Sequence, residues 1–178
     1  LKLLGGDCLN FGCVPSKTFI QQSKVQPDFA KAMTAVREIR AKISGHDSAQ
    51  RFKNLGVDVF FGQAQFDTPH SAILNNKTLK FKKAIIATGT RAAIPNIKNL
   101  DQINHLTNES VFNLTSLPNK FIIIGGGPIG CELAQAFRRF GSEVSVLLPE
   151  SHILPKEDAD CAEIIEKQFE ADGIEIIK

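Results

Sequence analysis

Residues 5–17 read GGDCLNFGCVPSK and place Cys8 and Cys13 with four residues between them. Pro15 suits the first turn of a helix, so Cys13 falls at the positive end of that helix. A thiolate is stabilised at such a position, and two thiols at this spacing can close a disulfide. The stretch predicts a redox-active pair of cysteines and not a structural crosslink.

A glycine-rich turn follows a short apolar stretch in the second half of the chain. Residues 121–124 read as a buried strand, the glycines that follow have the spacing G-x-G-x-x-G, and residues 129–140 have the pattern of a helix. Between a strand and a helix, these glycines let a pyrophosphate approach the helix N-terminus. Gly141 ends the helix, and residues 143–148 supply the next strand. The predicted nucleotide contacts are Gly125, Gly127, Pro128, Ile129 and Gly130.

A third candidate contact lies between these two motifs. Residues 84–87 are apolar, as in a buried parallel strand, and end in Thr88, Gly89 and Thr90. Small residues at the carboxyl end of such a strand allow a ligand to approach the backbone. On the residues alone, a tight turn without a ligand explains them equally well.

The remaining pattern predicts mixed helices and strands. Asp28 caps a helix that ends near Gly45, and the apolar residues of that helix recur every three or four positions. Further helices are expected at 14–25, 48–55, 109–112 and 159–172. Short strands are expected at 57–61, 71–74 and 78–81, forming an antiparallel meander, and a last strand begins at Ile174.

Composition excludes several classes of function. The chain has 178 residues and a net charge of +2 with both signs interspersed, so nothing indicates nucleic-acid or membrane partners. No apolar run is long enough for a membrane span and no signal segment opens the chain, so a cytoplasmic protein is expected. The four histidines are scattered away from the cysteines, and no metal site is predicted.

Taken together, the cysteine motif, the A-T-G turn and the glycine-rich turn resemble the class I pyridine nucleotide-disulfide oxidoreductases. The resemblance implies an α/β fold: parts of two Rossmann-like, three-layer domains binding FAD and NAD or NADP, with a small antiparallel β-meander. It implies a partial FAD-binding domain over 1–118 without its N-terminal fingerprint, and the first part of an NAD(P)-binding domain over 119–178. The C-terminal dimerisation domain would be missing from this fragment of a homodimeric enzyme.

The resemblance also assigns roles to residues. Cys13 would face the flavin, Cys8 would exchange with a small-molecule, disulfide or metal-ion substrate, and Lys17 would be buried beside the flavin ring with Glu132 as its counter-charge. These four residues are the predicted catalytic set, and Lys17 and Glu132 also count as cofactor contacts. The other implied flavin contacts are Gly5, Gly6, Asp7, Ala87, Thr88 and Gly89.

Three questions stay open on the sequence. Asp7, in place of the family's usual threonine, favours a mercuric-reductase-like subgroup, with dihydrolipoamide dehydrogenase as the alternative acceptor class. A non-catalytic nucleotide-binding fragment is the alternative of another kind. NAD and NADP are not separated, because Leu148 and Pro149 replace the residues that contact the ribose, while Glu150 or Lys156 could substitute for them.

Overall fold

The computed structural model describes residues 4–25 and 27–178. Its helices are α1 (Gly6–Asn10), α2 (Cys13–Val25), α3 (Phe29–Ser44), α4 (Ala49–Asn54), α5 (Pro128–Phe140) and α6 (Ala159–Ala171), with 3-10 turns at Leu100–Gln102 and Val111–Asn113. Its strands are β1 (Gln65–Thr68), β2 (Ser71–Leu74), β3 (Lys77–Lys80), β4 (Lys120–Ile124), β5 (Glu143–Leu147) and β6 (Glu175–Ile177). Within the described residues, no helix is long and apolar enough to cross a bilayer.

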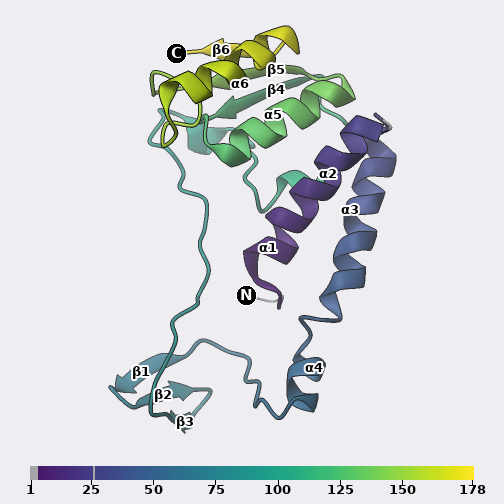
Figure 1. Ribbon diagram of the computed structural model, residues 1–178. Coiled ribbons are helices and arrows are strands. Elements are labelled where there is room, and N and C mark those ends of the chain that lie inside the picture. The colour runs from purple at the N-terminus through teal and green to yellow at the C-terminus, as the bar shows by residue number, and fades with distance from the viewer. Residues whose placement is uncertain (1–3, 26) are drawn as a thin grey trace.

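Strands β4, β5 and β6 form a parallel sheet in that order, as Figure 1 shows. Helices α5 and α6 cover the same face, because both crossovers are right-handed and advance in one direction. Val144 and Val146 of β5 point into that face and are buried. On the opposite face Ile122, Ile124 and Ile177 are 65%, 45% and 42% exposed. The α/β unit predicted around the glycine-rich turn is confirmed.

Helices α2 and α3 pack as an antiparallel hairpin, and α2 also packs against α5 (Figure 1). Phe19 of α2 is 1% exposed, and its ring centroid lies 5.1 Å from that of Phe137 and 4.7 Å from that of Phe140, both on α5. Phe29 of α3 and Phe112 pack edge-on against Phe19. We call these five side chains the aromatic cluster. It joins the cysteine-bearing helix to the helix that follows the glycine-rich turn.

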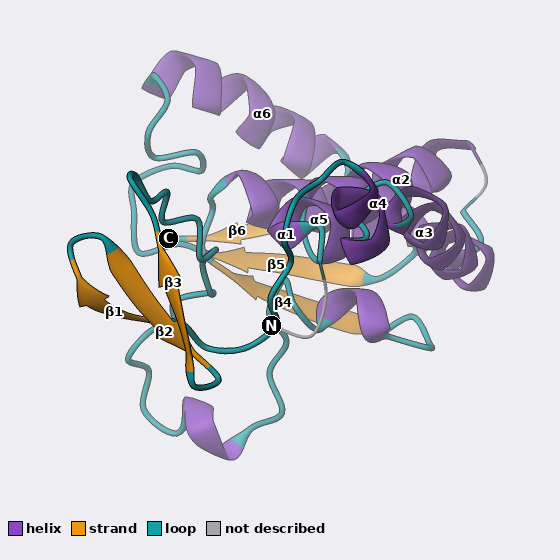
Figure 2. Cartoon of the chain, turned by 90° about the horizontal axis from the view of Figure 1, so that it is seen from below, coloured by secondary structure: helices purple, strands orange, loops and turns teal. Residues whose placement is uncertain are grey.

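The predicted meander is present as the antiparallel sheet β1-β2-β3, which stands apart from the parallel sheet in Figure 2. Asn75 and Asn76 link β2 to β3 with φ of 48° and 63°, the conformation of a two-residue hairpin turn. The predicted strand at 57–61 is wrong. Those residues form no strand, and the first strand of the meander lies at Gln65–Thr68.

The strand predicted at 84–87 is also wrong. The segment is a loop in which Ile85 and Ile86 are 93% and 73% exposed. An apolar run becomes a strand only where another strand satisfies its backbone N–H and C=O groups. Within the described part of the chain, no strand pairs with this one.

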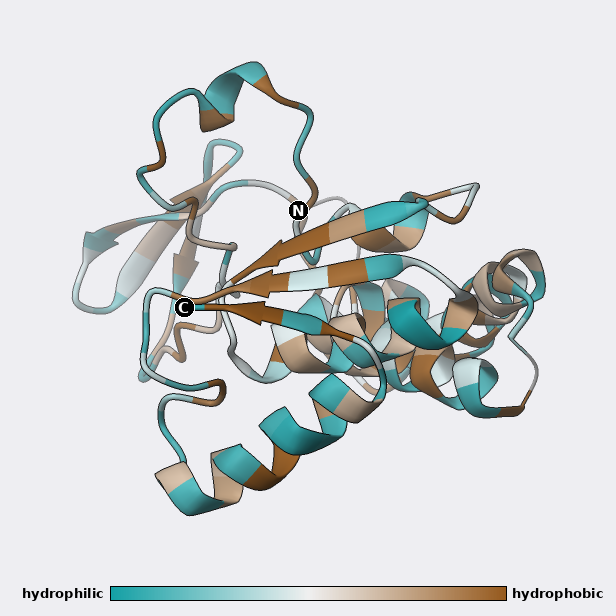
Figure 3. Cartoon of the chain, turned by 90° about the horizontal axis from the view of Figure 1, so that it is seen from above, coloured by the Kyte–Doolittle hydropathy of each residue, from teal (hydrophilic) through white to brown (hydrophobic). Residues whose placement is uncertain are grey.

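The ends of several helices lie close to where the sequence predicts them. The Asp28 side chain accepts from the backbone N–H of Lys31 at 3.1 Å, and Ser48 caps α4 in the same way through Arg51 at 3.2 Å. Gly141 ends α5 with φ of 107°. Figure 3 shows apolar residues running along the three parallel strands, with mixed polarity on the helices beneath them.

Candidate functional site

The two cysteines lie at the joint between α1 and α2. Cys8 is in α1 and Cys13 is the first residue of α2; both are exposed, free thiols. Gly12 makes the joint possible, because a Cβ there would lie 3.1 Å from the Asp7 carbonyl oxygen and 3.4 Å from Cys8 Cα. The close approach of the two short segments brings the thiols together.

The thiols interact directly. The neighbouring Cys13 side chain, as a hydrogen-bonding partner, raises the pKa of Cys8, and partial desolvation and charge on Cys13 add to the effect. Cys13 stands where the unpaired N–H groups of the first helical turn concentrate positive potential. In the reduced pair, Cys8 therefore holds its proton more tightly than an ordinary cysteine.

Asp7 ties the cysteine motif to the A-T-G turn. Its Oδ2 accepts from the backbone N–H of Thr90 at 3.2 Å and from the Thr90 hydroxyl at 3.1 Å. Gly89 has φ of 76°, and a Cβ there would lie 3.5 Å from the Asp7 carboxylate. The turn predicted to contact the flavin therefore lies beside the cysteine motif even though the strand expected before it is absent.

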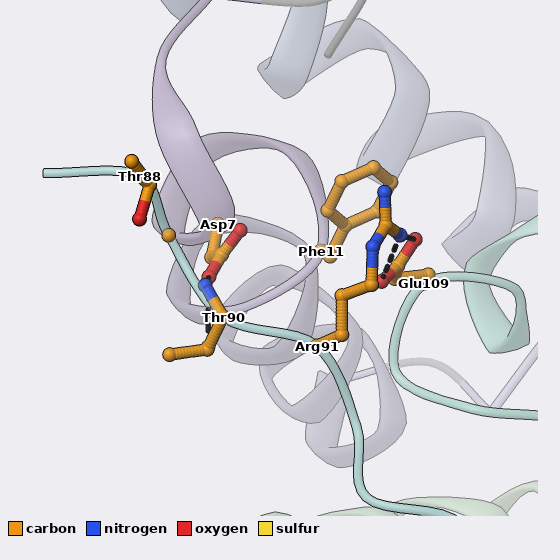
Figure 4. A pocket seen from close by; sticks show the side chains of 7 residues that line it. Asp7, Phe11, Thr88, Thr90, Arg91 and Glu109 are labelled. Atoms are coloured by element: carbon orange, nitrogen blue, oxygen red, sulfur yellow. Dashed lines mark hydrogen bonds and ion pairs between the residues drawn. The ribbon is translucent and has the colours of Figure 1, made fainter. Parts of the chain in front are cut away.

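A pocket of about 210 Å³ opens at this contact, as Figure 4 shows. One side carries Asp7, and the other carries Arg91, whose Nη1 lies 2.9 Å from both carboxylate oxygens of Glu109. The pocket lining comprises Asp7, Phe11, Thr88, Gly89, Thr90, Arg91 and Glu109. Sequence reasoning missed the Arg91–Glu109 pair, because the two residues lie in an irregular connector with no periodic pattern.

Lys17 and Glu132 form an ion pair between α2 and α5, although 115 positions separate them in the sequence. The structure thus brings together two residues that were paired only by resemblance. The expectation that Lys17 is buried is wrong, since its side chain is 61% exposed and that of Glu132 is 32% exposed. The pair is therefore open to solvent on its outer side.

The three fingerprint glycines have three distinct environments. Gly125 has φ of 106° and makes the tight turn after β4. A Cβ on Gly127, the N-cap of α5, would meet nothing within 4 Å, whereas one on Gly130 would collide with the Gly125 carbonyl oxygen. A tight turn, an open approach to the helix N-terminus and close helix–strand packing are the three requirements of a dinucleotide-binding turn. Pro128 and Ile129, both exposed, begin the helix.

The end of β5 offers no carboxylate to a ribose. Leu148 is 7% exposed, and its side chain lies against Gly126. Pro149, Glu150 and Lys156 are exposed on the loop that follows. The choice between NAD and NADP is therefore not made by the residue at the end of this strand.

Sequence reasoning also missed a set of contacts behind the glycine-rich turn. The backbone N–H of Leu154 donates to the Gly126 carbonyl oxygen at 2.7 Å, and Glu166 of α6 accepts from the N–H of Ile153 at 3.0 Å. No motif spacing indicates this arrangement. Among the residues that the structure describes, no cluster of histidine, cysteine or carboxylate side chains could hold a metal ion.

Comparison with known proteins gives one consistent answer. The family model described as pyridine nucleotide-disulphide oxidoreductase matches residues 2–178. Dihydrolipoyl dehydrogenase of Acholeplasma laidlawii is 32% identical over 99% of this chain and 59% of its own length. Mercuric reductase of Bacillus cereus is 28% identical over 98% of this chain and 30% of its own length.

A solved structure agrees with these relatives. The HOCl-induced flavoprotein disulfide reductase RclA from Escherichia coli superposes with a TM-score of 0.87 at 33% identity, covering 99% of this chain and 41% of that one. The chain thus spans from under a third to about three fifths of the length of the relatives it matches.

The residues present fit the two cofactors that the family implies, FAD and NAD(P)H. The open Gly127 and the close-packed Gly130 match a bound pyrophosphate at α5, and the turn held by Asp7 leaves Gly89 accessible beside the pocket. The α/β fold, the paired cysteines and the family match agree with one another. The chain belongs to the pyridine nucleotide-disulphide oxidoreductase family.

Proposed function

We propose that this chain carries the electron-relay part of an FAD-dependent NAD(P)H:disulfide oxidoreductase, with Cys8 and Cys13 as its redox pair. The observation that carries the proposal is the Lys17–Glu132 ion pair. It joins the cysteine helix to the nucleotide helix, which supports a shared site for the two motifs. A nucleotide turn and a thiol pair with separate functions would not require this bridge.

The chain's own residues hold the reacting groups. FAD, when bound, accepts a hydride from NAD(P)H and supplies an electron pair to the disulfide. On taking up that electron pair together with one proton, the one carried in the hydride, the Cys8–Cys13 bond would break and leave a thiol at Cys8 and a thiolate at Cys13. The positive end of α2 stabilises this charge, and the raised pKa of Cys8 keeps the proton on that residue.

Lys17 and Glu132 position the cofactor-facing side of the site. Lys17 lies one helical turn after Cys13, and Glu132 lies in the first turns of α5. Their pairing restrains the Lys17 side chain, which starts from the same face of α2 as Cys13, four residues earlier. We propose that Asp7, Gly5, Gly6 and the Ala87–Thr88–Gly89 turn form the adjoining flavin surface.

The proposed terminal acceptor is mercuric ion, a soft cation that thiolates bind well. The Asp7 variant of the motif supports this choice. Dihydrolipoamide is the second candidate, because dihydrolipoyl dehydrogenase matches with 32% identity and mercuric reductase with 28%. We further propose a cytoplasmic homodimer as the working form, by analogy with the family.

The test follows the thiols directly. Oxidised protein supplied with FAD is incubated with NADH or NADPH, quenched with iodoacetamide and mapped by mass spectrometry. Cys8 and Cys13 should become alkylated only when a nicotinamide is present. Acceptor reduction, assayed separately with Hg(II) and lipoamide, identifies the substrate class.

Cys13→Ser should abolish NAD(P)H-driven turnover with either acceptor. Cys161→Ser is the matched control, because Cys161 is an exposed thiol on α6 that takes no part in the proposed site. If dithiothreitol exposes Cys8 and Cys13 to alkylation but NAD(P)H does not, the proposed relay is wrong. Nucleotide binding without thiol reduction would instead support a non-catalytic nucleotide-binding protein.

A further inference from the structure

Glu166 lies on α6, away from the cysteines, and its carboxylate is held from two sides. Oε1 accepts from the backbone N–H of Ile153 at 3.0 Å, and Oε2 accepts from Lys178 Nζ at 2.9 Å. The side chain is only 14% exposed, whereas Glu163 on the same helix is 61% exposed. A shielded carboxylate with a backbone partner is worth more than a surface ion pair.

The segment that Glu166 holds reaches the glycine-rich turn. Ile153 is fully buried, and its Cα lies 3.1 Å from the position of a Cβ on Gly126. The next residue, Leu154, donates its N–H to the Gly126 carbonyl oxygen at 2.7 Å and has φ of 51°. Glu166 is therefore linked to the residue between the first two fingerprint glycines through its own hydrogen bond to Ile153 and the backbone bond of the next residue, Leu154.

The Glu166 carboxylate stays charged in this setting. Burial alone would raise its pKa, but the hydrogen bonds from Lys178 and Ile153, together with the charges of Lys178 and His152, outweigh burial and hold the pKa below its ordinary range. A charged acceptor binds an N–H more strongly than a neutral one. The contact to Ile153 therefore persists at neutral pH.

The Glu166–Ile153 contact also matters for ligand binding, because Ile153 lies in the loop that follows β5. In a dinucleotide-binding unit, the residues after the second strand border the adenosine ribose. Here that strand is β5, and the residue directly after it, Leu148, is turned against Gly126 and offers no polar group. The loop of residues 149–158, which carries the exposed Glu150 and Lys156, then borders the ribose site, and its backbone path helps to set the shape of that site.

We propose that Glu166 is a positioning residue for the nicotinamide nucleotide: it fixes residues 151–154 against Gly126 and thereby shapes the adenosine-ribose part of the site. This inference rests on the proposed function, because it assumes that the glycine-rich turn binds NAD(P)H. Glu166 itself touches no nucleotide. Its effect is transmitted through Ile153 and Leu154.

The experiment titrates the complete purified protein with NADH, NADPH and ADP-ribose, the last of which lacks the nicotinamide ring. Glu166→Ala should raise Kd for the preferred nucleotide and for ADP-ribose by the same factor, about tenfold. Glu166→Gln keeps an acceptor oxygen for Ile153 and should restore binding to within about threefold. Glu163→Ala, which removes an exposed ion pair from the same helix, is the control and should leave Kd unchanged.

Amide hydrogen exchange of the ligand-free protein supplies a second readout. Glu166→Ala should speed exchange at Ile153 and Leu154 and leave the amides of α5 unchanged. Wild-type affinity in Glu166→Ala, or equal losses in Glu166→Ala and Glu163→Ala, overturns the inference while the proposed function stands. Failure of the wild-type protein to bind either nicotinamide nucleotide overturns both.

Discussion

Individual charges at the site are arranged for chemistry more than for stability. The Lys17–Glu132 pair is largely exposed, and exposed pairs contribute about 0–1 kcal/mol to folding. Asp7 has a different task, since its carboxylate receives two hydrogen bonds from Thr90 and holds a turn 83 positions away. Both contacts connect segments that must lie together for the cysteines to meet a cofactor.

Cys13→Ala should make Cys8 easier to alkylate in the reduced protein. Removing the Cys13 side chain removes the hydrogen bond and the charge that raise the pKa of Cys8. A lower pKa gives more thiolate at a given pH, so the pH profile of the alkylation rate should move to lower pH. The rate is measured with iodoacetamide between about pH 6 and 10 by peptide mass spectrometry.

Cys161 provides the internal reference for that measurement, because it is exposed and lies on α6, away from the pair. Its alkylation rate should be the same in both proteins. A Cys8 profile that stays in place, or moves to higher pH, would show that Cys13 does not hold the proton on Cys8.

Two glycines at the start of helix α5 have different roles: Gly130 is needed for packing, and Gly127 leaves room for a ligand. Gly130→Ala places a Cβ against the Gly125 carbonyl oxygen and should destabilise the fold by about 1–3 kcal/mol. Gly127→Ala meets nothing within 4 Å and should cost about 1 kcal/mol or less, as an N-cap change. Thermal unfolding followed by circular dichroism measures both.

Nucleotide binding should reveal the role of Gly127. Although Gly127→Ala keeps the fold, the added methyl group occupies the approach to the helix N-terminus and should raise Kd for NAD(P)H at least tenfold. Unchanged binding in this variant would place the pyrophosphate elsewhere.

Elements with local signals were predictable from the sequence. Asp28, Ser48 and Gly141 act at helix ends as their types suggest, and Asn75-Asn76 makes the hairpin turn. The strands expected at 57–61 and 84–87 failed for one reason. A strand depends on a pairing partner that local sequence does not specify, and neither segment has one among the described residues.

In the candidate site, too, some features were predictable from the sequence and others were not. The environments of Gly125, Gly127 and Gly130 follow from their spacing, because each is set within one strand–turn–helix unit. The Asp7–Thr90 contact and the Glu166–Ile153 contact were not predictable. Each depends on how segments far apart in the sequence pack together, and no repeating pattern in the sequence predicts such a hydrogen bond.

For the whole molecule, the aromatic cluster is the main link between the helical hairpin and the α/β unit. Phe19→Ala should lower the free energy of unfolding by about 3–5 kcal/mol, because it empties a site surrounded by other rings. Urea unfolding followed by far-UV circular dichroism suits this chain, which has no tryptophan.

Phe66→Ala is the matched control, since Phe66 is a 59% exposed ring on the meander. Its loss should cost about 1 kcal/mol or less. Equal costs for the two variants would contradict a cluster that joins the two halves. A large loss in Phe19→Ala alone would show that packing in the cluster stabilises the contact between the cysteine helix and the nucleotide helix.

The uncovered face of the parallel sheet has a practical consequence. Parallel sheets are normally enclosed on both sides, yet Ile122, Ile124 and Ile177 lie on a face open to water. Contiguous aliphatic surface promotes aggregation, and salting-out ions such as sulfate strengthen that tendency. Preparations of this chain should therefore be kept dilute and free of sulfate, and light scattering should be checked before any titration is interpreted.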